Sequence, residues 1–340
     1  MELRTLGRSG TAVSTYALGT MTFGNETDED ASHDQLDVFL EAGGTLVDTA
    51  DVYTAGASEE IIGRWLDDRP AEVTDRVVLA TKARFPMGED ANDAGLSRRH
   101  LARGLDASLR RLQVDCIDLY QVHSWDPITP VEETLGFFDD VVRAGKVRYA
   151  GLSNFTGWQV QKAVDTAEHR HLPRPVTLQP QYNLLVREIE WEIVPACLEN
   201  GLGLLPWSPL GGGWLTGKYT RDQRPTGTTR LGEDPARGVE AYDKRSASER
   251  TWAVVDAVQA VAAARGVPMA QVALAWLHDR PAVTSVILGA RTTEQLTANL
   301  AAAGLHLSAA ETARLDQASD PAPADYPYGP AGSDQRARTL

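Results

Sequence analysis

Short apolar runs rich in β-branched residues alternate along this chain with longer stretches that have helical periodicity. The N-terminal stretch LRTLGRSGTAVSTYALGT differs, because two strand-like runs flank the turn GRSG and predict a β-hairpin. The apolar runs that follow predict eight further strands. They cover residues 16–20, 45–50, 77–82, 117–123, 148–154, 176–181, 202–208 and 284–290.

Helix start and stop signals lie between these strands. Ser97 suits the N-cap of a helix that continues through Arg111, and Thr129-Pro130 suits the start of the next helix. The other predicted helices cover residues 28–41, which stop at Gly43-Gly44, residues 187–200, which stop at Gly201, and roughly 246–265 and 268–278. The segment Leu210–Arg245 is left as a long loop rich in Gly, Thr, Asp and Arg, and loops of that length often cover binding sites.

Nearly continuous apolar strands that alternate with helices are typical of a parallel sheet. We therefore predict an α/β fold of one domain, residues 1–340: a (β/α)8 TIM barrel with an N-terminal hairpin, long active-site loops and a Pro/Ala-rich tail at 319–340. The alternative is an open doubly wound sheet, which normally has a glycine-rich dinucleotide turn after its first strand. The first strand here ends in LGTMTFGN, which is not that turn.

The charge of the chain limits its partners. Its formal net charge is −14, so we expect repulsion from nucleic acid and from anionic membrane surfaces, and local donors must hold any anionic ligand. Cys116 and Cys197 form no CxxC pair and are interpreted as core residues in a reducing compartment. With no apolar leader at the N-terminus and no apolar run of about 18 residues, the expected location is the cytoplasm.

In such a barrel the active site forms where the strands end. The predicted strand ends carry Gly19, Thr20 and Met21; Asp48 with Tyr53 beyond it; Lys82; His123; Ser153 and Asn154; Gln179 and Tyr182; Trp207 and Ser208; and Gly289 with Arg291. His169 and His171 lie instead at a predicted helix end without a third ligand nearby, so we interpret them as surface residues and predict no metal site.

Barrel closure would bring Asp48, Lys82, His123 and Tyr53 to one mouth. An ammonium beside a phenol lowers the pKa of the phenol, and Asp48 would keep Lys82 charged and directed at Tyr53. His123 would donate a hydrogen bond to a carbonyl oxygen, so the group forms an electrophilic site for an oxyanion. Tyr53 would then supply a proton when hydride reaches the carbonyl carbon.

The chain resembles the aldo-keto reductases, of the bacterial branch that is similar to potassium-channel β-subunits. The resemblance spans roughly residues 1–305, in family order. It rests on LGTMTFG, DTADVY, SEEIIG, LATK, SLRRLQVDCIDLYQVHSWDP, RAGKVRYAGLSNF, QPQYNLLVREIE, PWSPLGGGWLTGKY and ILGARTTEQLTANL. It implies a barrel that binds a nicotinamide cofactor without a Rossmann fold and reduces a small-molecule carbonyl compound.

The resemblance also implies residue roles. Asp48, Tyr53, Lys82 and His123 are the catalytic group, and an arginine at position 291 suits the 2′-phosphate of NADPH more than NADH. The implied cofactor residues are Gly19, Thr20, Met21 and Asp48; Ser153, Asn154 and Gln179 for the carboxamide; Tyr182 or Trp207 for ring stacking; Ser208, Pro209, Leu210 and Lys218 for the pyrophosphate; and Gly289, Arg291, Gln295 and Asn299 for the adenosine. Ala298 departs from the family, where many members have Glu against the adenine.

Variable loops should build a mostly apolar substrate pocket. Its expected wall residues are Phe85, Met87, Trp125, Trp214 and Tyr219. Two alternatives stay open: a non-enzymatic NADPH-binding redox-sensing subunit, and a reductase for a sugar-nucleotide or pyridoxal-type substrate. An NTPase is disfavoured, because GGWLTGKY has Tyr219 where a P-loop needs Ser or Thr. The oligomeric state is not predicted.

Overall fold

This computed structural model describes residues 1–221, 223–227, 230–234, 236, 238–329 and 332. Within them, the eight predicted strands form one parallel sheet. The strand order is β10-β3-β4-β5-β6-β7-β8-β9, and a parallel bridge between Leu204 and Val283 joins the two edges. The predicted barrel is confirmed. Its strands are β3 (Tyr16–Gly19), β4 (Leu46–Asp48), β5 (Val78–Ala83), β6 (Ile117–Val122), β7 (Val147–Ser153), β8 (Thr177–Gln179), β9 (Gly203–Leu204) and β10 (Val286–Leu288).

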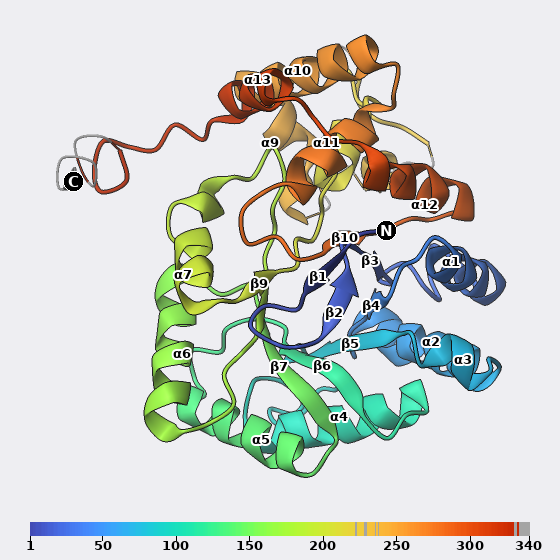
Figure 1. Ribbon diagram of the computed structural model, residues 1–340, viewed down its shortest axis with the longest axis vertical. Coiled ribbons are helices and arrows are strands. Elements are labelled where there is room, and N and C mark those ends of the chain that lie inside the picture. The colour runs from blue at the N-terminus through green and yellow to red at the C-terminus, as the bar shows by residue number, and fades with distance from the viewer. Residues whose placement is uncertain (222, 228–229, 235, 237, 330–331, 333–340) are drawn as a thin grey trace.

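The N-terminal hairpin closes one end of the barrel. Strands β1 (Leu3–Thr5) and β2 (Ala12–Ser14) pair antiparallel, as predicted, and lie across the middle of the ring in Figure 1. Leu6 and Val13 from this hairpin pack against the inward side chains Ala17, Leu46 and Leu119 in one buried cluster. The barrel interior at this end is therefore filled with apolar side chains, and polar chemistry is confined to the other end.

Helices surround the sheet, as Figure 1 shows. The predicted N-cap at Ser97 is present, because its side chain accepts a hydrogen bond from the backbone of His100. Asp28, predicted as the first residue of a helix, is instead the N-cap of α1 and accepts from the backbone of Ala31. The helices with their bounds are α1 (Glu29–Glu41), α2 (Ala57–Asp67), α3 (Ala71–Thr74), α4 (Arg98–Leu112), α5 (Val131–Arg143), α6 (Gly157–Arg170), α7 (Ile193–Asn200), α10 (Glu249–Arg265), α11 (Met269–His278), α12 (Thr293–Leu300) and α13 (Ala309–Ser319).

The helix predicted over residues 187–200 is divided. A 3₁₀ turn, η2 (Glu188–Glu190), precedes α7, and the chain bends between them at Glu192. Pro195 explains the break, since it has no N–H to donate to the carbonyl of Trp191 and is tolerated only in the first turn of α7. A smaller difference affects α5, whose N-cap is Pro130 rather than Thr129.

The long segment after β9 is more ordered than the sequence predicts. It contains η3 (Gly211–Thr216), α8 (Arg230–Glu233), η4 (Gly238–Glu240) and α9 (Tyr242–Ser246). Trp214 is fully buried at its centre, with the rings of Tyr219, Tyr242 and Trp252 within 5.2–5.4 Å. This aromatic cluster joins the segment to α10 and to the main hydrophobic core.

Beyond α13 the tail extends from the body of the barrel in Figure 1. Tyr328 stacks on Trp191 with ring centroids 5.4 Å apart, and the rest of the predicted tail, 330–331 and 333–340, lies outside the described residues. Cys197 is buried as predicted, whereas Cys116 is half-buried, and both are free thiols. Among the described helices none is by itself long and apolar enough to cross a membrane, although α10 and α11, bent by 103°, pass that test as a pair.

Candidate active site

Side chains two residues apart on a strand share a face, so the inward-facing positions just beyond the apolar layer lie at the open end of the barrel. Polar side chains occupy these positions. On β4, Leu46 belongs to the apolar cluster and Asp48 follows two residues later. On β5, Ala80 belongs to the same cluster and Lys82 follows two residues later. Neighbouring strands in register therefore place the carboxylate and the ammonium side by side.

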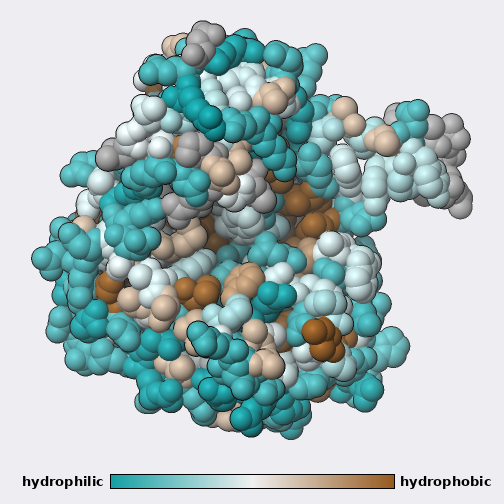
Figure 2. Space-filling model, turned by 180° about the vertical axis from the view of Figure 1, so that it is seen from behind, coloured by the Kyte–Doolittle hydropathy of each residue, from teal (hydrophilic) through white to brown (hydrophobic). Residues whose placement is uncertain are grey.

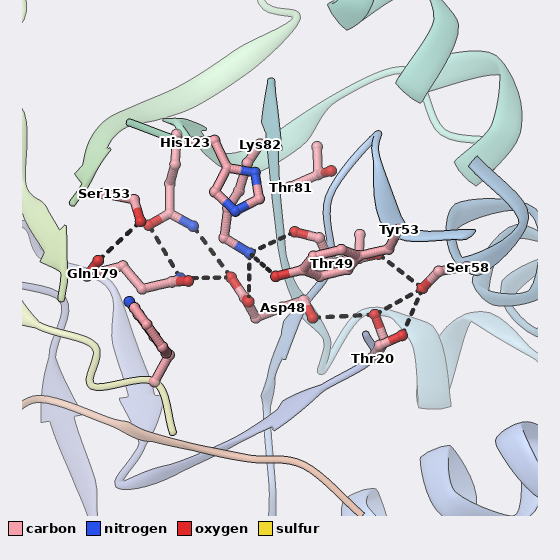
Figure 3. Close-up of polar contacts among 12 residues, drawn as sticks. Thr20, Asp48, Thr49, Tyr53, Ser58, Thr81, Lys82, His123, Ser153 and Gln179 are labelled. Atoms are coloured by element: carbon pink, nitrogen blue, oxygen red, sulfur yellow. Dashed lines mark hydrogen bonds and ion pairs between the residues drawn. The ribbon is translucent and has the colours of Figure 1, made fainter. Parts of the chain in front are cut away.

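Lys82 is at the centre of this group (Figure 3). Its Nζ lies 2.7 Å from Asp48 Oδ2, 2.8 Å from the carbonyl oxygen of Thr49 and 3.4 Å from Tyr53 Oη. Lys82 is 0% exposed and Asp48 is 1% exposed, so the ion pair is excluded from water. The sequence prediction that Asp48 holds Lys82 beside Tyr53 matches this geometry.

Gln121 is a site residue that sequence reasoning missed. It is fully buried, and its Nε2 donates to Asp48 Oδ1 at 3.2 Å. Gln179 Nε2 donates to the same oxygen at 2.8 Å. Two amide donors and one ammonium thus satisfy the buried carboxylate. Strand periodicity could have revealed Gln121, because it lies on β6 two residues after Leu119, which belongs to the inward-facing apolar cluster, and two residues before His123.

Tyr53 lies on a constrained turn, η1 (Tyr53–Gly56). Thr54 and Ala55 have φ values of 48° and 53°, a left-handed conformation that is uncommon without glycine. Thr54 Oγ1 donates to the Phe23 carbonyl at 2.9 Å, which anchors the turn to the loop after β3. Residues in such conformations persist where the surroundings fix them, and they cluster at functional sites.

His123 is the neutral member of the group. Its ring centroid lies 5.9 Å from that of Tyr53 and 4.7 Å from that of Phe85, both in edge contacts. Burial, then the charges of Lys82 and Arg84, lower its pKa to about 2. An uncharged imidazole can still donate one hydrogen bond.

The pKa of Tyr53 differs from the sequence expectation. Burial raises it above its ordinary value, and the opposing charge of Lys82 does not overcome that effect. Burial also acts to lower the pKa of Lys82, but Asp48 and Tyr53 outweigh it, so that pKa is raised. The predicted lowering effect of Lys82 on the phenol pKa is thus present, but burial, which the sequence did not predict, outweighs it, so the phenol stays protonated beside a charged ammonium.

The predicted carboxamide residues form a connected group next to this site. Ser153 Oγ donates to the backbone carbonyl of Gln179 at 2.8 Å, and Asn154 Nδ2 donates to the backbone carbonyl of His123 at 3.0 Å. Trp207 Nε1 donates to Asn154 Oδ1 at 3.1 Å, so the indole adjoins this group. Tyr182 instead is 1% exposed against Trp276, which leaves Trp207 as the candidate for ring stacking.

The remaining predicted cofactor residues lie on loops after β3, β9 and β10. Thr20 is buried and hydrogen-bonded to Asp48, while Met21 is 40% exposed. At Gly19 a Cβ atom would lie 2.6 Å from Ile287, so glycine is required. Ser208, with a φ of 54°, opens the loop that continues through the buried Pro209 and half-buried Leu210 to the exposed Lys218.

Arg291 is engaged by carboxylates. Its guanidinium lies 3.1 Å from Glu26 and 2.7 Å from Glu233, the last residue of α8. Its backbone N–H donates to Gln295 Oε1 at 3.1 Å. Asn299 is buried nearby on α12, and Gly289 is exposed with open space around it. A phosphate at Arg291 would have to compete with these acidic side chains.

The predicted wall residues divide into three that are partly exposed and two that are buried. Phe85, Trp125 and Met87 are partly exposed on the loops after β5 and β6, and the face in Figure 2 is hollowed near its centre. Trp214 and Tyr219 are 0% and 3% exposed within the aromatic cluster after β9, so they cannot line a pocket and that prediction was wrong. His169 and His171 are exposed at the end of α6, and the described residues include no group of three or more metal-ligating side chains.

The strand ends of this parallel barrel present a buried Asp–Lys pair, a tyrosine and a neutral histidine. Barrel enzymes of this fold have their active sites at the same end, where the strands finish. The chain belongs to the aldo/keto reductase family, whose sequence pattern matches residues 16–320. Aldo/keto reductases are oxidoreductases and generally use nicotinamide cofactors.

Three relatives illustrate the range of similar proteins. An uncharacterized oxidoreductase of Bacillus subtilis, YrpG, is 39% identical over 90% of this chain and 92% of its own length. A probable voltage-gated potassium channel subunit beta of rice, Oryza sativa, is 38% identical over 89% and 91%. Versiconal hemiacetal acetate reductase of Aspergillus parasiticus is 33% identical over 93% and 96%. The matches to the reductase-named relatives and to the channel-subunit relative thus span nearly the full length of both chains in each pair.

Proposed function

We propose that this protein is a carbonyl reductase that uses NADPH to convert an aldehyde or ketone to the alcohol, with Tyr53 as the general acid. The observation that carries the proposal is the buried contact of Lys82 Nζ with both Asp48 and Tyr53, next to a neutral His123. This arrangement keeps a proton on the phenol while a fixed positive charge lies beside it. It suits the protonation of an oxygen that becomes negative during the reaction.

The residues present fit a nicotinamide cofactor. The side-chain nitrogen of Gln179 donates to Asp48. The side-chain oxygen of Gln179 is therefore the group that can accept a hydrogen bond from a carboxamide. Ser153 and Asn154 adjoin it, and Trp207 would offer an aromatic face. Ser208, Pro209, Leu210 and Lys218 would hold the pyrophosphate, and Arg291, Gln295 and Asn299 the adenosine. The bound cofactor would supply the hydride.

The chain's own residues would orient the substrate and move the proton. His123 would donate its N–H to the carbonyl oxygen and direct it toward Tyr53. Tyr53 would release its proton to that oxygen as negative charge develops on it. Lys82 would stabilise the phenolate that remains, and Asp48, held by Gln121 and Gln179, would keep Lys82 in place.

NADPH is preferred over NADH in this proposal, because Arg291 can pair with a 2′-phosphate. The experiment is to follow NADPH and NADH absorbance with a panel of neutral aldehydes, ketones and dicarbonyls, and to quantify the alcohol formed. We expect one alcohol per cofactor oxidised and a higher kcat/KM with NADPH. Cofactor binding without turnover on the whole panel would contradict the reductase function.

A second candidate function rests on the rice relative, whose name is that of a channel subunit. In that case the protein would bind the cofactor and report its redox state to a partner while turning it over negligibly. Cofactor that stays bound through purification, together with no productive substrate, would favour this alternative.

A further inference from the structure

Arg84 is a cation at the mouth of the barrel that the proposed reaction does not use. It follows β5 directly and lies two residues after Lys82. Arg84 has a φ of 156°, so the regular strand ends at Ala83, and the guanidinium is placed by its contacts with Trp125 and with the ring of Phe85 on the loops after β6 and β5. One cation, Lys82, therefore lies inside the barrel, and a second lies on the loops at its open end.

The charge of Arg84 is poorly compensated. Its Nε is buried without a hydrogen-bond partner in the described structure, and its Nη2 makes one long contact, 3.4 Å from the carbonyl oxygen of Trp125. Among the described residues, no carboxylate oxygen lies within 4.0 Å of this guanidinium. Other shielded cations of this chain are paired: Lys82 with Asp48, and Arg111 with Glu59. A half-buried cation without a counter-ion is costly unless something pairs with it.

Asp126 is the carboxylate whose pKa Arg84 affects, but it is already engaged. It accepts hydrogen bonds from the backbone of Leu96 and Ile128 and from Thr129 Oγ1, at 2.9, 3.0 and 2.7 Å. Burial acts to raise its pKa, but these bonds and the charge of Arg84 lower it overall. Asp126 thus stabilises the loops after β5 and β6 and leaves the guanidinium available.

The surroundings connect Arg84 to the reacting centre. Its guanidinium carbon lies 5.1 Å from the centroid of the Phe85 ring, and that ring contacts His123 with centroids 4.7 Å apart. An anion on Arg84 would therefore lie at the same mouth as a carbonyl held by His123 and Tyr53. In a chain with net charge −14, such a local cation is what an anionic substrate needs.

We infer that Arg84 binds a carboxylate of the substrate, so that the substrate class is aldehydes or ketones that carry a carboxylate near the reacting carbonyl. The inference rests on the proposed carbonyl reduction for the reacting group. The planar guanidinium matches a carboxylate through two parallel N–H donors. A phosphate has the same anionic oxygens, so the experiment includes both.

The test compares 4-carboxybenzaldehyde, its methyl ester and 4-formylphenyl phosphate as substrates of wild type, Arg84→Met, Arg84→Lys and the control Arg143→Met. Arg143 is on α5, 75% exposed and paired with Asp139, so its loss changes net charge equally without touching the mouth. We expect Arg84→Met to lower kcat/KM for the carboxylate by about tenfold or more, and for the ester much less. Arg84→Lys should recover part of the loss, and Arg143→Met should match wild type.

Two results would overturn the inference. An equal loss for carboxylate and ester, with a shifted pH profile, would mean that Arg84 acts on His123 instead. If Arg84 raised kcat/KM for the phosphate more than for the carboxylate, the assignment to carboxylates would be overturned. Removing Arg84 removes one of the positive charges that lower the pKa of His123. Because that pKa is about 2 in wild type, the imidazole should stay neutral at pH 7 in the variant.

A binding measurement separates this inference from the proposed function. Ligand-detected NMR with 4-(hydroxymethyl)benzoate and its methyl ester, without cofactor, needs no turnover. Stronger binding of the carboxylate to wild type than to Arg84→Met supports the inference even if no aldehyde is reduced. Equal binding to both proteins overturns it, whether or not neutral aldehydes are substrates.

Discussion

Lys82 Nζ and Asp48 Oδ2 lie 2.7 Å apart at the open end of the barrel, and both side chains are almost fully excluded from water. Adjacent strands β4 and β5 fix this contact, because Asp48 pairs with Ala80 in the parallel register and Lys82 follows two residues later. Removing one partner of a buried pair leaves an uncompensated charge, whereas removing both does not.

Lys82→Met should therefore destabilise the protein by about 3–5 kcal/mol and abolish turnover. The double variant Lys82→Met/Asp48→Asn should regain part of the free energy of unfolding, because no buried charge is left, but no activity. Urea unfolding and NADPH oxidation measure the two effects. A double variant no more stable than Lys82→Met would contradict this account of the ion pair.

Gln121→Leu should lower the free energy of unfolding by about 1–3 kcal/mol, because Asp48 loses a buried donor. It should also reduce kcat more than it changes the Kd of the cofactor, since the displaced carboxylate no longer aims Lys82. The matched control is Gln317→Leu on the exposed side of α13. Similar unfolding curves for the two variants would show that Gln121 does not support Asp48.

Glu233→Gln should strengthen NADPH binding several-fold and leave NADH binding nearly unchanged. The Glu233 carboxylate is 2.7 Å from the Arg291 guanidinium, where it would compete with a 2′-phosphate. Fluorescence titration with each cofactor measures the two Kd values, and Glu41→Gln at the exposed end of α1 controls for net charge. The same change for both cofactors would place the 2′-phosphate elsewhere.

Asp51→Asn should raise the free energy of unfolding above that of wild type, and by more at pH 8 than at pH 5. Burial, and then repulsion from Glu59, raise the pKa of the Asp51 carboxyl to about 7. Because the pKa in the folded state is the higher one, the stability that Asp51 contributes is fully present below about pH 4 and is lost as the pH rises through 7.

Asparagine stays neutral throughout, so the difference in stability between variant and wild type should grow by roughly 3 kcal/mol between pH 5 and pH 8. Urea unfolding at the two pH values measures it. Asp67→Asn, at the exposed end of α2, should show little difference between them. A pH-independent effect of Asp51→Asn would mean that the carboxyl is already ionised in the folded protein at pH 5.

The barrel could be predicted because each strand carries its own local pattern. All eight strands were found, since continuous apolar runs between helix signals are decided by nearby residues. The break at Trp191–Glu192 was missed although Pro195 indicates it. The aromatic cluster after β9 was missed because Trp214, Tyr242 and Trp252 are far apart in sequence. Contacts of that kind are tertiary and leave no local period.

The candidate site was predicted in outline. Asp48, Lys82, Tyr53 and His123 lie together, as strand-end reasoning and the family resemblance both required. What the sequence did not reveal is how neighbours alter them: burial determines the pKa of Tyr53, and Glu26 and Glu233 engage Arg291 from two separate loops. These effects depend on distances and on exclusion of water, which no motif contains.

The proposed role of Tyr53 as proton donor is tested most directly by Tyr53→Phe, measured as NADPH turnover with the best neutral aldehyde and as NADPH affinity by fluorescence titration. We expect kcat to fall by about 10²–10⁴-fold while Kd stays within about twofold, because phenylalanine preserves the ring and removes only the transferable proton. Turnover within tenfold of wild type would show that another group donates the proton and that the role assigned to Tyr53 is wrong.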